Sequence, residues 1–295
     1  MKLAFRRYIP FLPIIFIIAA FLGLPSIQAV YYSFVHFKLA VPDPRNGEFV
    51  GLENFYAAFS SSEFQESLVN TVIIGLSSTF GILGLALCVA LLANSTFKGR
   101  PLYRAIVILP WAVSNSVAGE QFKYMLQSSL SPVALVLTWL GLIPDISAFN
   151  PLVTPTGAVI SVIATTIWKN APFVAIILLA GLQSIPPSYY EAARVDGAGT
   201  LQAFRRVTIP LLRPFINIGL LFSGIVGGTL VDIIYPLTLG GPGISTQNIS
   251  LQLYKIYFHY WDFGLGGAIS LFLLAYSIIL MVPLIRSMIK HVMGL

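Results

Sequence analysis

The residues best suited to bind a polar solute lie inside long apolar stretches. Trp168, Lys169 and Asn170 are consecutive in one such stretch, and Asp232 and Tyr235 lie in another. A charge near the middle of a bilayer costs about 2.5–3.5 kcal/mol on insertion scales, so Lys169 and Asp232 are expected to face protein or water rather than lipid. Two interpretations stay open. The side chains line a hydrophilic path for a solute, or Lys169 and Asp232 pair and hold two helices together.

Catalytic patterns are absent from the sequence. No Gly-x-x-x-x-Gly-Lys-Ser/Thr phosphate loop occurs, so we expect no ATP site on this chain. His-Glu-x-x-His and Gly-x-Ser-x-Gly are missing too, which argues against an enzyme. The single cysteine, Cys88, excludes a multi-cysteine metal site, and the isolated His36, His259 and His291 predict no metal cluster.

A polar loop with its own helix signals carries a second possible activity. Ser188 and Glu191 have capping-box spacing, which predicts a helix that starts just after Pro187 and ends at Gly197. Thr200 is then expected to cap a second short helix that ends at Pro210. Small side chains leave a low surface that another protein could approach closely, namely Ala192, Ala193 and Ala198. The alternative is a connector folded against the ends of its own helices.

The elements that position these residues are membrane spans. Among 295 residues, 57% are apolar and only 9% charged, against roughly 25% charged in soluble proteins. About 20 apolar residues cross a bilayer as a helix, and six stretches qualify: 8–35, 68–93, 103–126, 157–183, 213–239 and 267–288. We expect an all-α integral membrane protein with one domain over 1–295. Amphipathic helices are expected within 51–68 and from Ile249 to Tyr257, with a helix break at Gly240–Gly243.

Basic residues are distributed unevenly between the loops. The N-terminus, the second loop, the fourth loop and the C-terminus together hold twelve Lys and Arg, whereas the alternate loops hold three and seven of the eleven carboxylates. Positive residues stay on the cytoplasmic side, so both termini are expected there. This topology explains the net charge of +6, and no nucleic-acid partner is needed.

The amino-acid sequence of the polar loop resembles a known coupling element. Glu191-Ala192-Ala193, then Gly197, then Val207-Thr208-Ile209-Pro210 are similar to the EAA loop of permease subunits in ATP-binding-cassette importers. The resemblance runs from about Ile9 to Pro283 and is greatest to carbohydrate-type permeases of the maltose and glycerol-3-phosphate group. The stretches that narrow it are Gly51-Leu52-Glu53-Asn54-Phe55, Asn70-Thr71, Ile185-Pro186 and Leu237–Gly243, with Leu239 at the variable place of Leu-Thr-x-Gly-Gly-Pro.

This resemblance implies a fold, partners and sites. The fold would be the six-span type I importer permease, multi-pass in the inner membrane of a prokaryote. The partners would be a second permease in a heterodimer, two ATPase subunits that carry the ATP and magnesium, and an external solute-binding protein. The coupling loop is 186–210, and its expected contact residues are Tyr190, Glu191, Ala192, Ala193, Asp196, Gly197 and Ala198. The expected pathway residues are Trp168, Lys169, Asn170, Asp232, Tyr235, Thr238, Gly240 and Gly241.

Other functions remain as alternatives to import of a sugar or polyol. A self-contained secondary transporter is one, although such proteins have broken helices in both halves and only one break is evident here. A permease for glycerol phosphate or an amino acid is another. A membrane scaffold would leave the polar residues of the third to fifth spans without a purpose.

Overall fold

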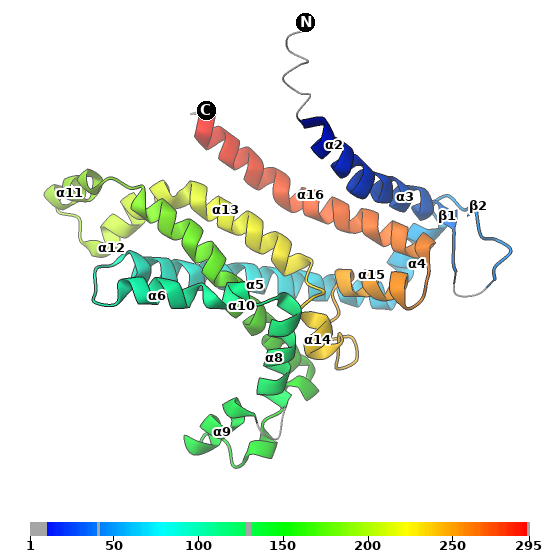
Figure 1. The fold of residues 1–295 in the computed structure, drawn as a ribbon, viewed down its shortest axis with the longest axis horizontal. Coiled ribbons are helices and arrows are strands. Elements are labelled where there is room, and N and C mark those ends of the chain that lie inside the picture. The colour runs from blue at the N-terminus through cyan, green and yellow to red at the C-terminus, as the bar shows by residue number, and fades with distance from the viewer. Residues whose placement is uncertain (1–10, 40–41, 128–130, 294–295) are drawn as a thin grey trace, which may run out of the picture. The chain divides into compact units, whose positions relative to one another are not determined.

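Two compact units make up the chain. The computed structural model describes residues 11–39, 42–127 and 131–293, the side chains of Leu12 and of 288–293 excepted (Figure 1). One unit is Met1–Gln65 with Gln252–Tyr276, and the other is Glu66–Leu251 with Ser277–Leu295. Three of the residues counted for topology, Lys2, Arg6 and Arg7, lie outside the described residues, as do the first residues of the expected span 8–35.

Five helices of the described residues are long and apolar enough to cross a membrane. They are Pro13–Ser33, Ser62–Asn94, Pro155–Gln183, Thr200–Gly228 and Phe263–Ser287. Pro13–Ser33 comprises α2 (Leu12–Ile18), a π-helical turn, η2 (Ala19–Gly23), and α3 (Leu24–Ser33), whose first turn holds Pro25. The other long helices are α5 (Ser62–Asn94), α10 (Pro155–Gln183) and α16 (Phe263–Met293).

The third apolar stretch is not one helix. It is divided into α6 (Arg100–Val107), α7 (Leu109–Ala112) and α8 (Asn115–Gln127), so the expected span over 103–126 is made of separate helices rather than one. Val113 has extended backbone, with φ −72° and ψ 141°. Ser114 then starts α8, because its hydroxyl accepts from the amide of Val117 at 3.3 Å and its carbonyl from that of Ala118 at 2.9 Å.

The fifth apolar stretch differs from its prediction at both ends. A continuous helix runs from α12 (Thr200–Ala203) through the π-helical turn η5 (Phe204–Thr208) into α13 (Ile209–Gly228). Pro210 does not end a helix, because the π-helical turn η5 lies directly before it and adjusts the backbone hydrogen bonds there, with the amide of Ile209 donating to the carbonyl of Phe204. The expected span 213–239 is wrong beyond Gly228, where α13 ends and only the short α14 (Ile234–Thr238) follows.

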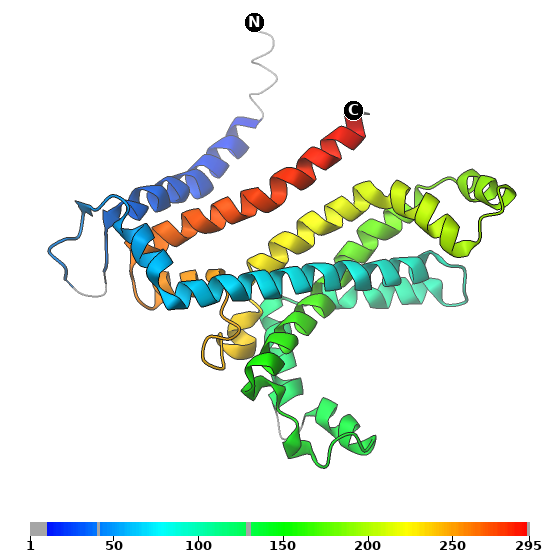
Figure 2. The same ribbon diagram turned by 180° about the vertical axis from the view of Figure 1, so that it is seen from behind.

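The core of the larger unit lies between α5, α10 and α13, which Figure 2 shows from behind. Its buried residues are Ile82, Ala86, Ala90, Ala171, Val174, Ala175, Leu178, Leu182 and Leu212. Glycines allow close approach as well, since a Cβ at Gly181 would lie 2.5 Å from the ring of Phe215. Small residues at contacts are how helices pack in lipid, where the hydrophobic effect between them is weak. This unit also holds α9 (Pro132–Trp139), η3 (Ile146–Ala148), η4 (Pro151–Val153) and α11 (Pro187–Val195).

The smaller unit is organised by the amide of Asn54. It contains the antiparallel pair β1 (Val35–His36) and β2 (Glu48–Phe49), α4 (Glu53–Ser60), most of α15 (Ile249–Phe258) and the start of α16. The Asn54 side chain donates to the carbonyls of Ser33 and Val35, both at 3.0 Å. It thereby satisfies backbone acceptors where α3 ends. The helices expected within 51–68 and at Ile249–Tyr257 are confirmed as α4 and α15.

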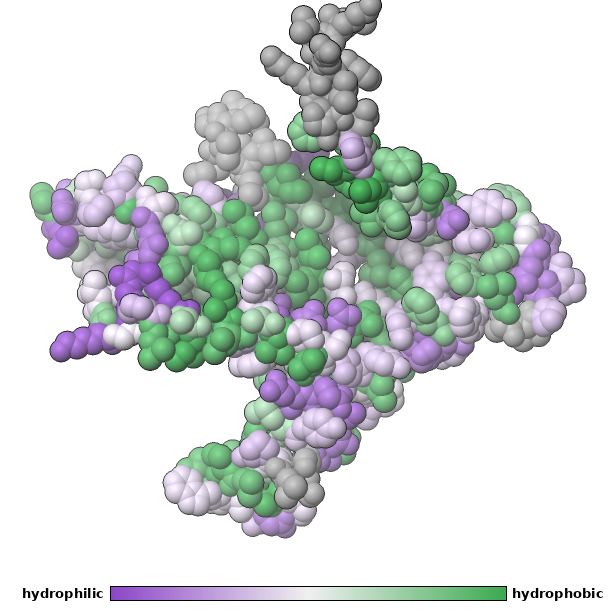
Figure 3. All heavy atoms as spheres, viewed as in Figure 1, coloured by the Kyte–Doolittle hydropathy of each residue, from purple (hydrophilic) through white to green (hydrophobic). Residues whose placement is uncertain are grey.

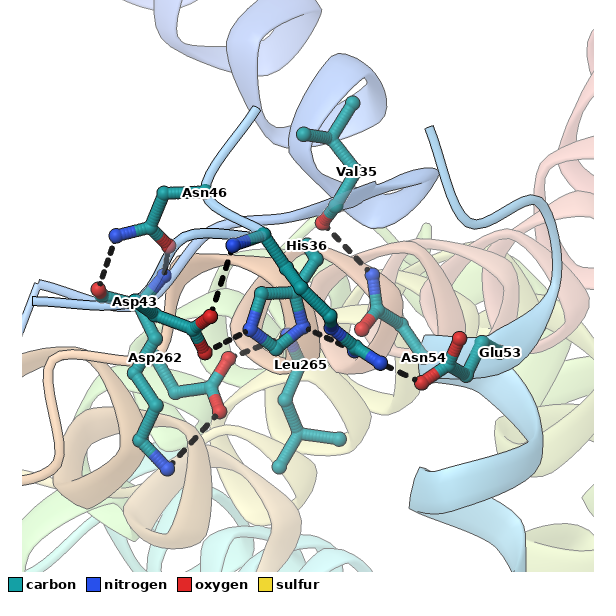
Figure 4. A network of polar contacts seen from close by, with 10 residues as sticks. Val35, His36, Asp43, Asn46, Glu53, Asn54, Asp262 and Leu265 are labelled. Atoms are coloured by element: carbon teal, nitrogen blue, oxygen red, sulfur yellow. Dashed lines mark hydrogen bonds and ion pairs between the residues drawn. The ribbon is translucent and has the colours of Figure 1, made fainter. Parts of the chain in front are cut away.

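A polar network fixes the loop between β1 and β2 (Figure 4). Arg45 donates to His36 Nδ1 at 2.9 Å and to Glu53 at 3.1 Å, so His36 Nε2 is left to donate to Asp43 at 2.7 Å. The amide N–H of Arg45 and the contact with His36 hold the pKa of Asp43 below its ordinary value of 3.8. Hydrogen bonds therefore hold the described part of this loop from 42 to 47 against β1 and α4.

Candidate coupling and translocation sites

The helix of the coupling loop begins without the predicted capping box. Its first residue is Pro187, the preceding residue Pro186 has extended backbone, and no side chain caps the N-terminus. The capping role of Ser188 and Glu191 is therefore wrong. The reason is local, because a proline at the first helical position needs no amide partner and places Ser188 inside the helix. Thr200 likewise caps nothing, since it is the first residue of α12 and Gly199 precedes it as the N-cap.

The end of the coupling helix follows the prediction from Gly197. Its φ of +78° is left-handed. The amide of Gly197 donates to the carbonyl of Arg194 at 3.0 Å, and the amide of Ala198 donates to that of Ala193 at 2.9 Å. These two bonds form a Schellman motif, which satisfies the last carbonyls of a helix. A residue without a Cβ makes this turn without strain.

The coupling residues divide between an outer and an inner face. Glu191, Ala192, Asp196 and Gly197 are exposed, whereas Tyr190, Ala193 and Ala198 are partly buried. The Tyr190 hydroxyl lies 3.1 Å from that of Thr208, which joins α11 to η5. Behind the loop lies a cleft of about 540 Å³, lined by coupling-loop residues and by the ends of α5 and α10. Figure 3 shows hydrophilic residues gathered at this end of the larger unit.

Apolar side chains are also exposed on this loop. Val195 is 87% exposed, Leu201 63% and Tyr189 51%. Neither Glu191 nor Asp196 forms an ion pair with another described residue. These apolar side chains are therefore exposed on a loop that also carries exposed carboxylates.

The expected pathway residues of α10 have different environments. Trp168 is 36% exposed and packs against Phe122 of α8, with ring centroids 5.2 Å apart. Lys169 is 5% exposed, and its Nζ donates to the carbonyl of Trp111 at 2.9 Å. Asn170 is also buried and donates to Thr166 within its own helix. Lys169 and Asp232 form no ion pair, and Asp232 is exposed in the break between α13 and α14.

The glycine segment after α14 is a tightly held loop. Leu239 has φ +56° and Gly240 φ +93°, so the predicted helix break is confirmed. The Thr238 and Thr246 hydroxyls lie 2.7 Å apart, and the hydroxyl of Thr246 also donates to the carbonyl of Gly241 at 3.0 Å. Thr238 therefore has its hydroxyl engaged within the chain.

Two residues of α5 hold the same loop. Asn70 donates to the carbonyls of Ile244 and Gln247 at 2.8 and 3.2 Å. Thr71 accepts from the amide of Ile249 at 2.9 Å. Asn70-Thr71 and the Gly-Gly-Pro-Gly segment were noted separately in the sequence, and the fold brings them together. Sequence reasoning missed this role because more than 170 residues separate the partners.

Gln247 and Asn248 are fully buried in this loop. The side-chain amide of Gln247 donates to the hydroxyl of Ser67 at 3.2 Å, and the side-chain amide of Asn248 donates to the carbonyl of Leu230 at 3.0 Å. A polar side chain in an apolar segment indicates that it forms a hydrogen bond in the folded protein, but the sequence does not show with which partner. Across the described residues, no group of three or more His, Cys, Asp or Glu is placed to hold a metal ion.

Comparison with known proteins shows which family this chain is similar to. The model of the family "Binding-protein-dependent transport system inner membrane component" matches residues 82–291. The trehalose/maltose transport system permease protein MalF of Thermococcus litoralis is 36% identical over 92% of this chain and 90% of its own. The sulfoquinovosyl glycerol transport system permease protein SmoG of Agrobacterium fabrum is 37% identical over 90% of this chain and 84% of its own.

A solved structure matches nearly the whole fold. It is a bacterial alginate ABC transporter in complex with an alginate pentasaccharide-bound periplasmic protein. The TM-score is 0.79 at 26% identity, over 96% of this chain and 93% of that one. The chain therefore belongs to the binding-protein-dependent transport system inner membrane components and is a permease subunit of an ATP-binding-cassette importer, not an enzyme.

Proposed function

We propose that this subunit imports a sugar or a related polyol across the cytoplasmic membrane of a prokaryote. The observation that carries the proposal is the identity of 36–37% with permeases named for trehalose/maltose and sulfoquinovosyl glycerol transport, over at least 90% of this chain. Polar and aromatic groups that remain accessible near the helix breaks support it, namely Trp168, Asp232 and Tyr235. Such groups suit a hydroxyl-rich solute.

The same residues define the proposed pathway. Trp168, Asp232 and Tyr235 would contact the solute, because their side chains retain exposure. Thr238, Gly240 and Gly241 would shape the loop beside it, and the buried Asn170 would stabilise α10 from within. Lys169 has a different environment, which is taken up below.

The pathway would lie between this chain and a second, similar permease. Much of the apolar surface of Pro13–Ser33 and of Phe263–Ser287 is not covered within the chain, and lipid and a partner helix bundle would cover it. A heterodimer is favoured by the segment Leu237–Gly243, which resembles that of one of the two permeases in such systems. An external solute-binding protein would deliver the solute. That agrees with the periplasmic protein in the complex of the alginate transporter.

Coupling would run through α11. Its outer face would present Glu191, Val195 and Asp196 to a groove of an ATPase subunit. Each permease would bind one ATPase subunit, and ATP and magnesium would bind to the ATPase rather than to this chain. Tyr190 and Ala198, which line the cleft, and the partly buried Ala193 would transmit the motion inward to the helix that continues into α13.

Reconstitution of the whole complex in lipid provides the test. ATP hydrolysis is measured with disaccharides, polyols, glycerol phosphate, amino acids and metal ions, each with the binding protein present. Stimulation by a saccharide or polyol is the expected result, and a response confined to amino acids or metals refutes the solute assignment. Glu191→Lys is expected to abolish stimulation. Glu48→Lys, the same charge change on exposed β2, is the matched control and should leave it intact.

Orientation is tested by cysteine labelling in a Cys88→Ser background. Glu48 and Gln202 are suitable labelling positions because both are exposed. Asn46, in the same loop as Glu48, is less suitable, because its side chain bonds the backbone N–H and carbonyl of Lys38 and its substitution would break both bonds. In intact cells an impermeant reagent should modify Glu48→Cys and spare Gln202→Cys. The reverse pattern contradicts the topology.

A further inference from the structure

Lys169 lies at the middle of α10 and is nearly inaccessible. Its side chain is 5% exposed in a helix that runs from Pro155 to Gln183. The Nζ donates across to the third apolar stretch, to the carbonyl oxygen of Trp111 at 2.9 Å. A basic side chain buried at this depth requires a partner that offsets its removal from water. Here that partner is a backbone carbonyl and not a carboxylate.

The carbonyl of Trp111 belongs to the helix end that the break creates. Helix α7 ends at Ala112, Val113 is extended, and α8 begins at Asn115. The last carbonyls of a helix have no amide four residues further on to accept from. Within a bilayer water does not replace that partner, so another part of the protein must supply the donor. Lys169 supplies it at Trp111.

Aromatic contacts join the same turn of α10 to both sides of the break. Trp111, before the break, stacks on Phe173 with ring centroids 5.0 Å apart. Phe122, after the break, packs on Trp168 at 5.2 Å. Phe173 in turn packs on Phe222 of α13 at 4.5 Å. The amine and the two rings therefore attach α7 and α8 separately to one short stretch of α10.

We infer that Lys169 is a positioning residue that holds the break in the third apolar stretch in place by donating to the carbonyl of Trp111. The role differs from a solute ligand, because the donor is already used within the chain and its side chain is covered. Fixing α7 and α8 against α10 sets where the accessible Trp168 lies. The consequence for solute transport rests on the function proposed above, whereas the structural role does not.

Hydrogen exchange of the assembled, solute-free complex in lipid nanodiscs tests the structural role. Lys169→Met keeps the length of the side chain and removes the donor. Loss of this donor is expected to speed amide exchange over residues 109–118 by roughly 10- to 100-fold, which corresponds to the free energy of a hydrogen bond to a charged group. Lys169→Arg retains a donor and should restore slow exchange in part. Thr166→Val is the matched control, because that buried hydroxyl bonds only within α10.

A second perturbation keeps the test independent of the lysine. Phe173→Leu removes the ring that stacks on Trp111 while leaving Lys169 in place, and it should speed exchange over the same residues. If neither variant alters exchange over 109–118 relative to Thr166→Val, the inference is refuted. The readout needs no solute, so a wrong solute assignment would leave it unaffected.

Transport kinetics separate positioning from solute binding. A positioning role predicts that Lys169→Met lowers the maximal rate by a similar factor for every transported solute, and that Lys169→Arg recovers part of it. A solute-ligand role predicts a raised KM, with exchange over 109–118 in the solute-free complex unchanged. That second combination overturns the inference.

Discussion

Replacement of Gly227 by alanine should destabilise the bundle, although alanine is the better helix former. In the structure α13 crosses α5 at this glycine, and an added Cβ would lie 2.7 Å from the carbonyl oxygen of Gly75 and 3.2 Å from Thr79 Oγ1. The hydroxyl of Thr79 donates to the carbonyl of Gly75 within α5 at 2.7 Å, and it lies 3.2 Å from the backbone carbonyl oxygen of Ser223 on α13, so a polar contact also joins the two helices here. The close approach is between two backbones, and neither can move aside as a flexible side chain would.

The size of the effect follows from these distances. Carbon and carbonyl oxygen approach to about 3.3 Å in favourable contacts, so the helices must separate by roughly 0.6 Å at Gly227. Overpacking of this kind costs about 1–3 kcal/mol. Alanine regains about 0.5–1 kcal/mol over glycine within a helix. The net loss is then about 1 kcal/mol, and the separation also weakens the contact between Thr79 and Ser223.

Gly224→Ala is the control for this prediction. It lies one turn earlier on α13, and a Cβ there meets nothing within 4 Å, so only the gain in helix propensity remains. The two variants change the same atoms, and the difference between them isolates the packing cost of about 1–3 kcal/mol.

Thermal unfolding of the purified complex in one lipid mixture measures the difference. Gly224→Ala should raise the apparent Tm slightly and Gly227→Ala should lower it, with about 2–4 °C expected for each kcal/mol. Co-purification of the ATPase shows whether assembly is intact. Equal melting of the two alanine variants would refute the argument that backbone contact, rather than glycine flexibility, requires Gly227.

Three other substitutions test the local geometry. Gly197→Val should strain the left-handed turn after α11 and lower coupled ATP hydrolysis. Gly199→Val should have only a small effect on hydrolysis, because Gly199 has φ −72° and equally open space around it; ATPase assays of both variants measure the difference. Asn54→Asp should destabilise more than Asn54→Ala, because a carboxylate facing carbonyls adds repulsion to a lost hydrogen bond of about 1–3 kcal/mol; limited proteolysis reports it. The pKa of Asp43 is depressed, so its contribution is complete above 3.8 and is lost as pH falls below that value; unfolding curves of Asp43→Asn and the parent chain should converge only there.

Local chemistry made several features of this chain predictable. Apolar stretches between charged residues pointed to the five described helices that are long and apolar enough to cross a membrane, because hydropathy depends on composition alone. Gly197 was identified as a helix stop, since the left-handed turn and its two hydrogen bonds involve neighbours in sequence. Likewise, the glycines after α14 forced a break wherever the rest of the chain lay.

Other local signals were ambiguous, and the sequence alone chose wrongly. Ser188 and Glu191 have capping-box spacing, but the helix already begins at Pro187, so Ser188 lies within its first turn instead of at the N-cap. Pro210 indicates a helix end, yet the helix continues through it, because the π-helical turn η5 lies directly before this proline. In both cases two local rules applied to the same residue, and hydropathy patterning does not rank them.

The tertiary structure alone decided what the polar residues of the membrane helices do. Asn70 and Thr71 hold a loop more than 170 residues away, and Lys169 caps a helix end 58 residues before it. Hydropathy sums over a window and is blind to the extended residue Val113, which separates α7 from α8 in the third apolar stretch. A buried donor must be satisfied, which the sequence by itself determines, but the acceptor is whichever carbonyl the packing of the helices leaves unpaired beside it.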